Sequence, residues 1–332
     1  MSRNFSAPLP HGGDLDAARK LFPHAPEPFI DLSTGINPFL YPVPPLPSDA
    51  FARLPEPAAL ERLTAVAARA YGAPSPDHVV AAPGIQILLP MVATLVRPGR
   101  AAVLGPTFAE HARVAALAGH KLQEVSDTAS MSGADLGIVV NPNNPDGRVL
   151  RKDALLALAD TLGLLVVDEA FMDVGPADAG LAGVARANIV VLRSFGKFFG
   201  LAGLRLGFAL AAPEIAARLR ASLGPWAVSG PAIAIGASAL ADESWVAATR
   251  ARLDAMATRL DALLAGAGLA IVGGTSLFRL VRTPAAGELF HHLGRAGVFV
   301  RRFAEQPEWL RFGLPAGEVD WQRLATALKA SW

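Results

Sequence analysis

Three segments of this chain share one pattern, in which a short apolar run leads directly into polar side chains. They are residues 136–147 (LGIVVNPNNPDG), 164–171 (LLVVDEAF) and 190–208 (VVLRSFGKFFGLAGLRLGF). Apolar runs of this length, separated by helix-like stretches, are typical of strands in a parallel sheet that is covered on both faces. Ligands of such sheets bind beyond the carboxyl ends of the strands. The pattern therefore predicts that an amide, a carboxylate and an amine meet at one sheet edge.

The third segment carries the residue with the most specific chemistry. Lys197 lies three residues after Ser194 and eight residues before Arg205. This order suits a lysine that forms a Schiff base with a phosphorylated aldehyde, while Ser194 and Arg205 hold the phosphate. A lysine considered alone is more often a solvated surface residue. The other two segments, which supply Asp168 and Asn144, favour the chemical interpretation.

Each candidate also has a plainer interpretation when it is considered singly. Asp168 could cap a helix, and Asn144 could be an ordinary turn residue between prolines. Phe108, which follows the apolar run 101–104, could be a core residue. The hypothesis of a shared site depends on their occurring together and in this order.

Composition limits the class of protein. The chain has 332 residues, enough for two domains of about 150 residues and for a large buried core. Its net charge of +1 gives no broad basic surface for nucleic acid. The absence of cysteine excludes disulfides, zinc–thiolate sites and a cysteine nucleophile, and we predict no metal site. We expect no signal peptide and no membrane span, and predict a cytoplasmic protein.

Strand-like and helix-like segments alternate until about residue 210, after which the pattern becomes α+β. We expect strands at 78–82, 101–104, 136–140, 164–167, 189–192 and 206–210, and helices at 14–22, 57–71, 85–96, 107–118 and 151–162. Beyond the break at 224–226 we expect one long helix at 231–267, strands at 269–272, 276–281, 298–301 and 309–314, and a helix at 286–296.

These elements predict an α/β fold with a large domain, built on a mostly parallel central sheet, and a small α+β domain. We expect residues 1–27 to form an N-terminal arm that joins the small domain. Residues 28–226 would form the large, cofactor-binding domain, and residues 227–332 the small C-terminal domain.

The motifs Asn-Pro-Asn-Asn-Pro, Asp-Glu-Ala-Phe and Ser-x-x-Lys, with an arginine eight residues after the lysine, resemble those of the pyridoxal-phosphate (PLP) enzymes of aminotransferase fold type I. Their order and spacing match over most of the chain. The resemblance implies that Lys197 forms the Schiff base with PLP, Asp168 pairs with the protonated pyridine nitrogen and Asn144 bonds the phenolic oxygen. It implies phosphate or ring contacts from Gly84, Ile85, Gln86, Phe108, Ser194 and Arg205.

Further motifs resemble the threonine-phosphate decarboxylases of cobalamin biosynthesis. These are His-Gly-Gly-Asp at 11–14, DLSTGINP at 31–38, Phe171 and PWAVSG at 225–230. Histidinol-phosphate aminotransferases usually carry tyrosine where Phe171 stands, and a tyrosine hydroxyl could donate to the phenolic oxygen of PLP. The resemblance implies a PLP-dependent carboxy-lyase that converts L-threonine O-3-phosphate to (R)-1-amino-2-propanol O-2-phosphate.

The resemblance also implies which residues bind this substrate, which carries two anionic groups. Arg311 would take the carboxylate and Arg301 would contact the substrate, since guanidinium groups suit carboxylates and phosphates alike. Considered singly, Arg301 with Arg302 could be a solvated strand end, and His11 a turn residue. The implied substrate-binding set is His11, Gly12, Asn37, Asn144, Arg301 and Arg311.

Three positions depart from the family pattern. Gly196 replaces a hydroxyl residue that is common before the lysine, and Leu54 replaces a tyrosine that reaches the partner subunit's cofactor phosphate in many relatives. Asp146 replaces a threonine. The first two changes remove phosphate hydrogen bonds and the third adds negative charge. We therefore expect weaker PLP binding than in relatives.

Other functions stay open, because PLP serves transamination and decarboxylation alike and the cofactor motifs do not separate them. One alternative is a histidinol-phosphate-type aminotransferase. Another is a non-catalytic partner subunit in the attachment of aminopropanol to the corrin ring, although retention of Lys197, Asp168, Asn144 and Arg205 argues against it. The resemblance implies a homodimer, and a partner protein of cobinamide synthesis is a further hypothesis. Neither glycine-rich nucleotide-binding pattern is present.

Overall fold

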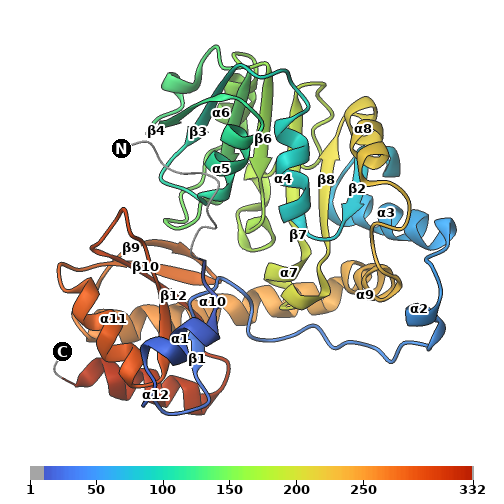
Figure 1. Cartoon of the computed structure of the whole chain (residues 1–332). Coiled ribbons are helices and arrows are strands. Elements are labelled where there is room, and N and C mark those ends of the chain that lie inside the picture. Colours follow the sequence, from blue (N-terminus) through green and yellow to red (C-terminus); the bar gives the residue numbers. More distant parts are fainter. Residues whose placement is uncertain (1–10, 331–332) are drawn as a thin grey trace. The chain divides into compact units, whose positions relative to one another are not determined.

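The computed structural model describes residues 11–330, which divide into two compact units (Figure 1). The first unit contains residues 41–144 and 148–245, and the second contains residues 11–40, 145–147 and 246–330. No helix among these residues is long and apolar enough to cross a membrane. The first ten residues of the expected N-terminal arm lie outside the described part of the chain.

The first unit is built on a seven-stranded sheet in the order β2-β8-β7-β6-β5-β3-β4 (Figure 1). Neighbouring strands are parallel except in the two pairs that include β8. The prediction of an α/β fold with a mostly parallel sheet is therefore confirmed. The strands are β2 (Val79–Ala82), β3 (Arg100–Leu104), β4 (Lys121–Val125), β5 (Leu136–Val140), β6 (Leu164–Asp168), β7 (Ile189–Ser194) and β8 (Gly207–Ala211).

Helices follow the strands and cover both faces of this sheet. Pro57 stands at the first position of α3, and Gly72 ends that helix in the left-handed conformation at φ 73°, which glycine adopts without strain. The helices are α2 (Asp49–Ala52), α3 (Pro57–Tyr71), α4 (Ile85–Ala93), α5 (Glu110–Leu117), α6 (Lys152–Ala159), α7 (Phe195–Phe198), α8 (Pro213–Leu223) and α9 (Gly230–Ala241). Single 3₁₀ turns lie at Pro76–His78, Ala129–Met131, Met172–Val174, Ala177–Ala179 and Ala202–Leu204.

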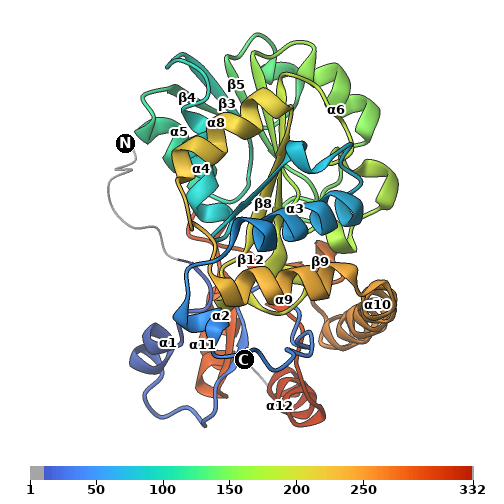
Figure 2. The same cartoon turned by 90° about the vertical axis from the view of Figure 1, so that its right-hand side faces the viewer.

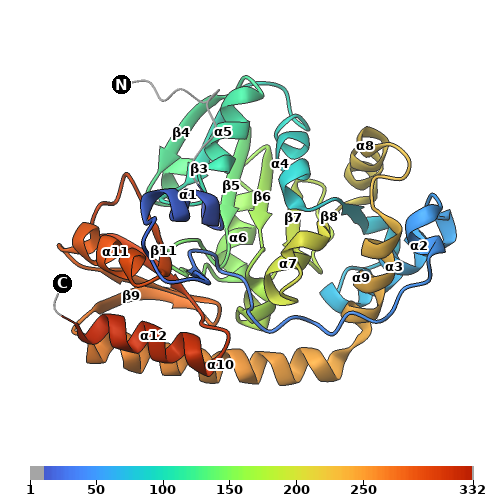
Figure 3. The same cartoon turned by 60° about the horizontal axis from the view of Figure 1, so that its bottom comes forward.

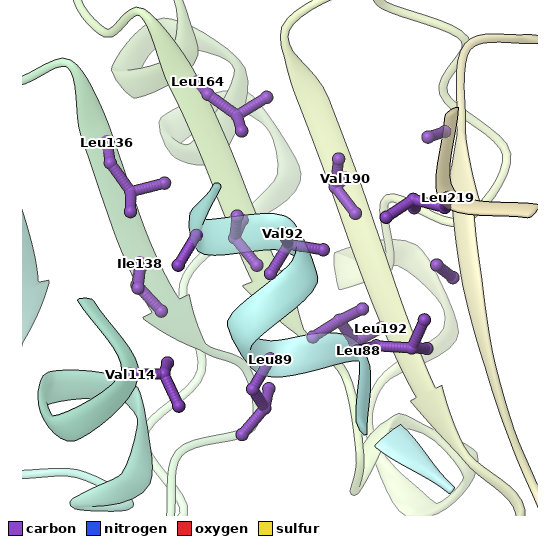
Figure 4. Packing of buried hydrophobic residues seen from close by; sticks show 14 of the residues in the cluster. Leu88, Leu89, Val92, Val114, Leu136, Ile138, Leu164, Val190, Leu192 and Leu219 are labelled. Atoms are coloured by element: carbon purple, nitrogen blue, oxygen red, sulfur yellow. The ribbon is translucent and has the colours of Figure 1, made fainter. Parts of the chain in front are cut away.

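The main core lies between one sheet face and helices α4, α5 and α8. Alternate residues of β5, β6 and β7 point to this face, and every residue of these three strands is buried. Helix α6 lies on the opposite face (Figure 2). Burial on both faces explains why these strands are continuous apolar runs in the sequence. Residues labelled in Figure 4 include Leu88, Leu89 and Val92 of α4, with Leu136, Ile138, Leu164, Val190 and Leu192 of the strands.

The second unit is an α+β structure, as expected. Its sheet has the order β1-β11-β12-β10-β9, with β1 parallel to β11 and the other pairs antiparallel. Helix α12 lies beside α10 (Figure 3), where Arg259 donates to Glu318 at 2.8 Å and stacks on the Trp321 ring. The elements are α1 (Leu15–Leu21), β1 (Ile30–Leu32), α10 (Glu243–Gly266), β9 (Ala270–Thr275), β10 (Phe278–Arg282), α11 (Ala286–Arg295), β11 (Val298–Arg302), β12 (Trp309–Gly313) and α12 (Glu318–Lys329).

The structure corrects several sequence-based expectations. The single helix expected at 231–267 is two helices, because the Asp242 carboxylate accepts from the Trp245 N–H and starts α10 anew. Strands β1 and β4 and helices α8 and α12 were not predicted. Strand β4 is an edge strand with mostly polar, exposed residues and therefore lacks an apolar run.

The unit boundaries also lie later in the chain than expected. Strand β1 pairs with β11, so residues 28–40 group with the second unit rather than with the large domain. Helix α9 packs against α3 of the first unit, which moves the expected boundary after residue 226 into α10, between residues 245 and 246. Pairing and packing set both boundaries, and neither leaves a local signal in the sequence.

Candidate active site

The carboxyl ends of β5, β6 and β7 lie side by side in the first unit. Val140 pairs with Asp168, and Asp168 pairs with Leu192. The segments that follow these strands begin with Asn141, Glu169 and Phe195. The sheet therefore brings the three polar segments to one edge, as their shared pattern predicts.

Asp168 is buried at this edge with a histidine against it. His111 Nε2 lies 2.8 Å from Asp168 Oδ2, and both side chains are almost fully buried. The Ala170 N–H donates to Asp168 Oδ1 at 2.9 Å. Each carboxylate oxygen can accept a second hydrogen bond, so Asp168 retains capacity for a ligand N–H.

His111 is a further candidate that the sequence analysis missed, because it contacts Asp168. Its ring meets the Phe108 ring edge to face, with centroids 5.8 Å apart. Residues three apart on a helical turn share a face, and the Phe108-x-x-His111 spacing was the available signal. Phe108 also packs partly buried against the main core, so its plainer interpretation as a packing residue holds alongside a role at the site.

Gly84 and Arg205 approach each other at the start of α4. Gly84 has φ 82°, which L side chains rarely adopt, so the backbone calls for glycine. A Cβ there would also lie 2.7 Å from Arg205 Nη2 and displace that side chain. Gly207 likewise lets β8 approach the Ile85 N–H closely. A guanidinium next to the N–H groups of a helix start forms a cradle for an anion. Ser194 lies at the end of β7.

Gln86 contributes to this region in a different way from its neighbours. Its side-chain amide donates to Glu110 Oε2 at 3.0 Å, which ties α4 to α5. The side chain therefore has a structural partner, and any contact of Gln86 with an anion would come from its backbone N–H. Gly84, Ile85 and Gln86 thus offer main-chain groups rather than side chains.

Asn143 ties the loop after β5 to a neighbouring segment. Asn143 is buried, accepts from Thr107 Oγ1 at 2.6 Å and donates to the Pro106 carbonyl at 3.0 Å. These two bonds tie the β5 loop to the segment that carries Phe108. Asn144, the next residue, is half-buried and remains a candidate for the phenolic oxygen.

Lys197 is half-buried on the single turn of α7. Its Nζ lies 5.9 Å from the centroid of the Phe171 ring, so these two candidates from different strands lie close together. Phe199, two residues on, stacks between Phe195 at 4.4 Å and Trp245 at 5.5 Å. This aromatic packing anchors the turn that carries the lysine.

The departures from the family pattern lie in three settings. A Cβ on Gly196 would lie 2.8 Å from the Ala202 Cα, so the backbone excludes a hydroxyl residue there. Leu54 is 65% exposed and lies just after α2. Asp146 is half-buried in the 145–147 segment, which groups with the second unit.

The residues of the first unit fit pyridoxal phosphate. Arg205 and the start of α4 suit a phosphate, the buried Asp168 suits a pyridinium nitrogen, and Lys197 suits an aldehyde. Glycine at positions 84 and 207 keeps the cradle open, because a side chain at either position would fill it.

Two candidate arginines pair in the second unit. Arg301 of β11 lies directly opposite Arg311 of β12, so their side chains share one face of the sheet. Arg311 is buried, and its Nη2 donates to the Ser33 carbonyl at 2.8 Å. Burial, and then the charge of Arg301, lower the pKa of Arg311, and burial lowers that of Arg301. The Asp31 carboxylate opposes the shift at Arg311. Two like charges on one sheet face repel each other, so an anion bound beside them would be stabilised.

The remaining second-unit candidates lie on the N-terminal segments. Gly12 packs so closely on the Ser33 carbonyl that a Cβ would overlap it, and the Gly13 N–H donates to Ser33 Oγ at 2.7 Å. The structure therefore brings Gly12 to the residue that binds Arg311. Asn37 is buried and its amide oxygen accepts from the Phe39 N–H, whereas His11 is exposed.

Comparison with known proteins identifies a family and relatives of this chain. A model of the family described as aminotransferase class I and II matches residues 48–328. Threonine-phosphate decarboxylases from Pseudomonas aeruginosa and from a Sinorhizobium species are each 42% identical to this chain. The alignments cover 96% and 97% of this chain, and 97% and 98% of the relatives.

A solved structure supports the fold over the same extent. Histidinol-phosphate aminotransferase from Sinorhizobium meliloti, in complex with pyridoxal-5'-phosphate, is similar with a TM-score of 0.80 and 24% identity. The match covers 99% of this chain and 97% of that chain.

Proposed function

Because this chain belongs to the aminotransferase class I and II family, whose enzymes depend on PLP, we propose that it decarboxylates L-threonine O-3-phosphate. The product would be (R)-1-amino-2-propanol O-2-phosphate, the linker of the cobalamin nucleotide loop. The names of the two relatives at 42% identity support this substrate. Among the structural observations, the pairing of Arg301 with Arg311 carries the proposal.

The arginine pair favours a substrate with more than one anionic group. Two guanidinium groups that face the same side of a sheet repel each other. An anion bound beside them would offset this electrostatic repulsion. Each guanidinium can bind a carboxylate or a phosphate through two parallel hydrogen bonds. L-Threonine O-3-phosphate carries one group of each kind, so Arg311 would take the carboxylate and Arg301 would contact the phosphate end.

The first unit would supply the groups that act at the α-carbon. PLP, when bound, accepts the electron pair that remains after carbon dioxide leaves. Asp168 would keep the pyridine nitrogen protonated, and the bonds from His111 and the Ala170 N–H hold its carboxylate in place. Lys197 would attach the cofactor and, once released and protonated, donate a proton from its ammonium group to the α-carbon. Asn144 would hold the phenolic oxygen.

The mass of the product separates the proposed function from its alternatives. The PLP-loaded protein is incubated with L-threonine O-3-phosphate in the presence of 2-oxoglutarate. Aminopropanol phosphate with released carbon dioxide supports decarboxylation. Glutamate with a phosphorylated keto acid would instead identify an aminotransferase, and no product at all would favour the partner-subunit hypothesis.

A Lys197→Ala variant tests the attachment directly. We expect it to fold but to retain no cofactor mass after borohydride reduction, whereas the wild-type chain keeps it. Lys152→Ala, at an exposed position at the start of α6, is the matched control. Retention of the cofactor mass in Lys197→Ala would remove Lys197 from its proposed role.

We also propose that the protein is a homodimer. Phe51, Leu54 and Trp226 are exposed by 71%, 65% and 58% in the first unit. Leu54 and Trp226 line adjoining pockets that share Pro55 and Ile233. A patch of this kind is typical of a protein interface. Light scattering should give twice the chain mass, and Trp226→Ser should weaken association; a monomer at all concentrations would contradict the proposal.

A further inference from the structure

A buried cluster of charged residues lies directly behind the candidate site. Arg193 donates from Nη1 to Glu169 Oε2 at 3.1 Å and from Nη2 to Asp173 Oδ1 at 2.5 Å. All three side chains are at least nine-tenths buried. The cluster is completed by Tyr71 of α3, whose ring lies 4.5 Å from the Arg193 guanidinium carbon.

The cluster is adjacent in sequence to two candidate cofactor residues. Glu169 follows Asp168 at the end of β6, and Arg193 precedes Ser194 at the end of β7. Asp168 pairs with Leu192, so Glu169 comes next to Arg193 one step further along the two strands. Because side chains alternate along a strand, Glu169 and Arg193 point to the face opposite Asp168 and Ser194.

The ion pair lies where the strand pairing ends. The Glu169 N–H donates to the Leu192 carbonyl at 2.8 Å, just beyond the last paired residues, Asp168 and Leu192. Glu169 Oε1 also accepts from the Leu181 N–H at 2.5 Å, so the carboxylate is held on both sides. Beyond this point the Glu169–Arg193 bond links the ends of β6 and β7 directly, while the end of β7 also pairs with β8 through Ser194 and Gly207.

Stability alone does not account for a charged group in this place. Burial raises the pKa of Glu169, although the Arg193 charge opposes that shift, so the ionised form is costly here. Well-packed apolar residues often replace a buried ion pair without loss of stability. A fixed, forked hydrogen-bond geometry is what apolar residues would not supply.

We propose that the Glu169–Arg193 ion pair positions the cofactor by fixing the separation between Asp168 and Ser194. These two residues are the proposed contacts for the ring nitrogen and the phosphate of PLP, at opposite ends of the cofactor. Glu169 and Arg193 touch neither group and act through the strand ends, so they are positioning residues. The inference rests on the proposed roles of Asp168 and Ser194, but not on the reaction or the substrate.

The test compares two variants that each remove one carboxylate charge from the same guanidinium. Glu169→Gln changes the link between the strand ends, whereas Asp173→Asn changes a contact to the 3₁₀ turn Met172–Val174. Tyr71→Phe is a further control, because it keeps the ring over Arg193. The measurements are the dissociation constant for PLP, the visible circular dichroism of the bound cofactor and the thermal midpoint, all without substrate.

We expect Glu169→Gln to raise the PLP dissociation constant on the order of tenfold and to change the visible circular dichroism, as loss of outer hydrogen-bond partners does at metal sites. Asp173→Asn and Tyr71→Phe should leave both cofactor readouts near wild type, even where they lower the thermal midpoint. Equal effects of Glu169→Gln and Asp173→Asn, or no effect of Glu169→Gln on either cofactor readout, would overturn the inference.

Arg193→Lys keeps the test decisive if Glu169→Gln does not fold. A lysine keeps the charge but cannot bridge two carboxylates with a planar fork. We expect Arg193→Lys to bind PLP more weakly and to change the visible circular dichroism of the bound cofactor. A wild-type dissociation constant and a wild-type spectrum in this variant would refute the positioning role. The binding measurement contains no substrate, so the two proposals fail independently. Normal PLP binding by every variant would contradict the positioning role. Absence of decarboxylation by the PLP-loaded wild-type chain would contradict the proposed reaction.

Discussion

Close packing explains why residue 196 is glycine, although the sequence around Lys197 does not reveal it. The backbone of Ala202 passes so close that a Cβ would lie 2.8 Å from its Cα. The aromatic stack of Phe195, Phe199 and Trp245 holds the same turn from another side. Position 196 therefore lacks a hydroxyl that could bind phosphate, because the backbone packs closely behind the lysine.

A Gly196→Ser variant tests this explanation. Because the clash is with backbone, we expect a loss of about 1–3 kcal/mol in the free energy of unfolding, as for other overpacked sites. Gly203→Ser is the matched control, since a Cβ there meets nothing within 4 Å. Urea denaturation of both variants measures the difference, and equal stabilities would show that sterics do not exclude serine at position 196.

The arginine pair leads to a second prediction for single residues. Arg301→Ala should raise the KM for L-threonine O-3-phosphate about 10- to 100-fold, because a hydrogen bond between charged groups contributes about 1.5–3 kcal/mol. Arg302→Ala is the control, since Arg302 is exposed and stacks on Phe290. Steady-state kinetics of the two variants decide, and an unchanged KM in Arg301→Ala would remove that residue from the substrate site.

Among the elements, helix starts depend on particular caps. Ser229 begins α9, where its hydroxyl accepts from the Ala232 N–H at 3.3 Å, and Pro231 stands in the first turn. Asp242 begins α10 in the same way. These two caps divide a stretch that is uniformly helical in its pattern, so they determine where α9 and α10 begin.

Removal of the α9 cap should be measurable. We expect Ser229→Ala to lower the free energy of unfolding by about 1 kcal/mol, because it leaves a backbone N–H of the first turn without its side-chain acceptor. Ser238→Ala, on an exposed position of the same helix, should change it much less. Chemical denaturation compares the two, and equal effects would contradict a capping role.

The contact between α10 and α12 should depend on pH. Hydrogen bonding to Arg259 lowers the pKa of Glu318 from its usual 4.5. A depressed pKa means that the pair stabilises the fold above the unfolded value and that this contribution disappears as pH falls through the folded value. Glu318→Gln should therefore be slightly destabilising at neutral pH and neutral well below pH 4.5, as measured by denaturation. A difference that persists in acid would contradict the pairing.

For the whole molecule, the cofactor residues come from distant parts of the sequence. Gly84 precedes α4, Asp168 ends β6 and Arg205 precedes β8, and these three positions of the first unit adopt this arrangement only in the folded chain. A ligand that binds the native chain alone stabilises it by mass action. PLP should therefore act as a stabiliser of the first unit as well as a catalytic group.

This stabilisation gives a direct measurement. At a PLP concentration about 100 times its dissociation constant, we expect about 2.7 kcal/mol of added stability and a higher thermal midpoint. Scanning calorimetry with and without PLP measures the shift, and Lys197→Ala should show a smaller one. An unchanged midpoint in the wild-type chain would mean that PLP does not bind the folded protein.

Sequence motifs identified the candidate site residues, but not the interactions that hold those residues in place. Lys197, Asp168 and Asn144 follow apolar runs, so the parallel-sheet pattern brought them to one edge. Asn143 and Glu169 lie within the recognised motifs, and His111 is three residues after Phe108, but the bonds of His111, Asn143 and the Glu169–Arg193 pair join residues far apart in the sequence and could not be predicted from it. Edge strand β4 was missed because its residues are mostly polar, whereas helices α8 and α12 were missed although each has a buried apolar face.

The sequence by itself determined the α/β class, the parallel sheet and the order of the polar segments, because local periodicity and strand ends are written in neighbouring residues. Tertiary structure alone decided that β1 joins the second sheet, that α9 packs with the first unit, and that Arg301 faces Arg311. The tertiary structure also explains why residue 196 is glycine, since the Ala202 backbone leaves no room for a side chain there. These features depend on contacts between segments distant in the chain, whose pairing no local pattern encodes.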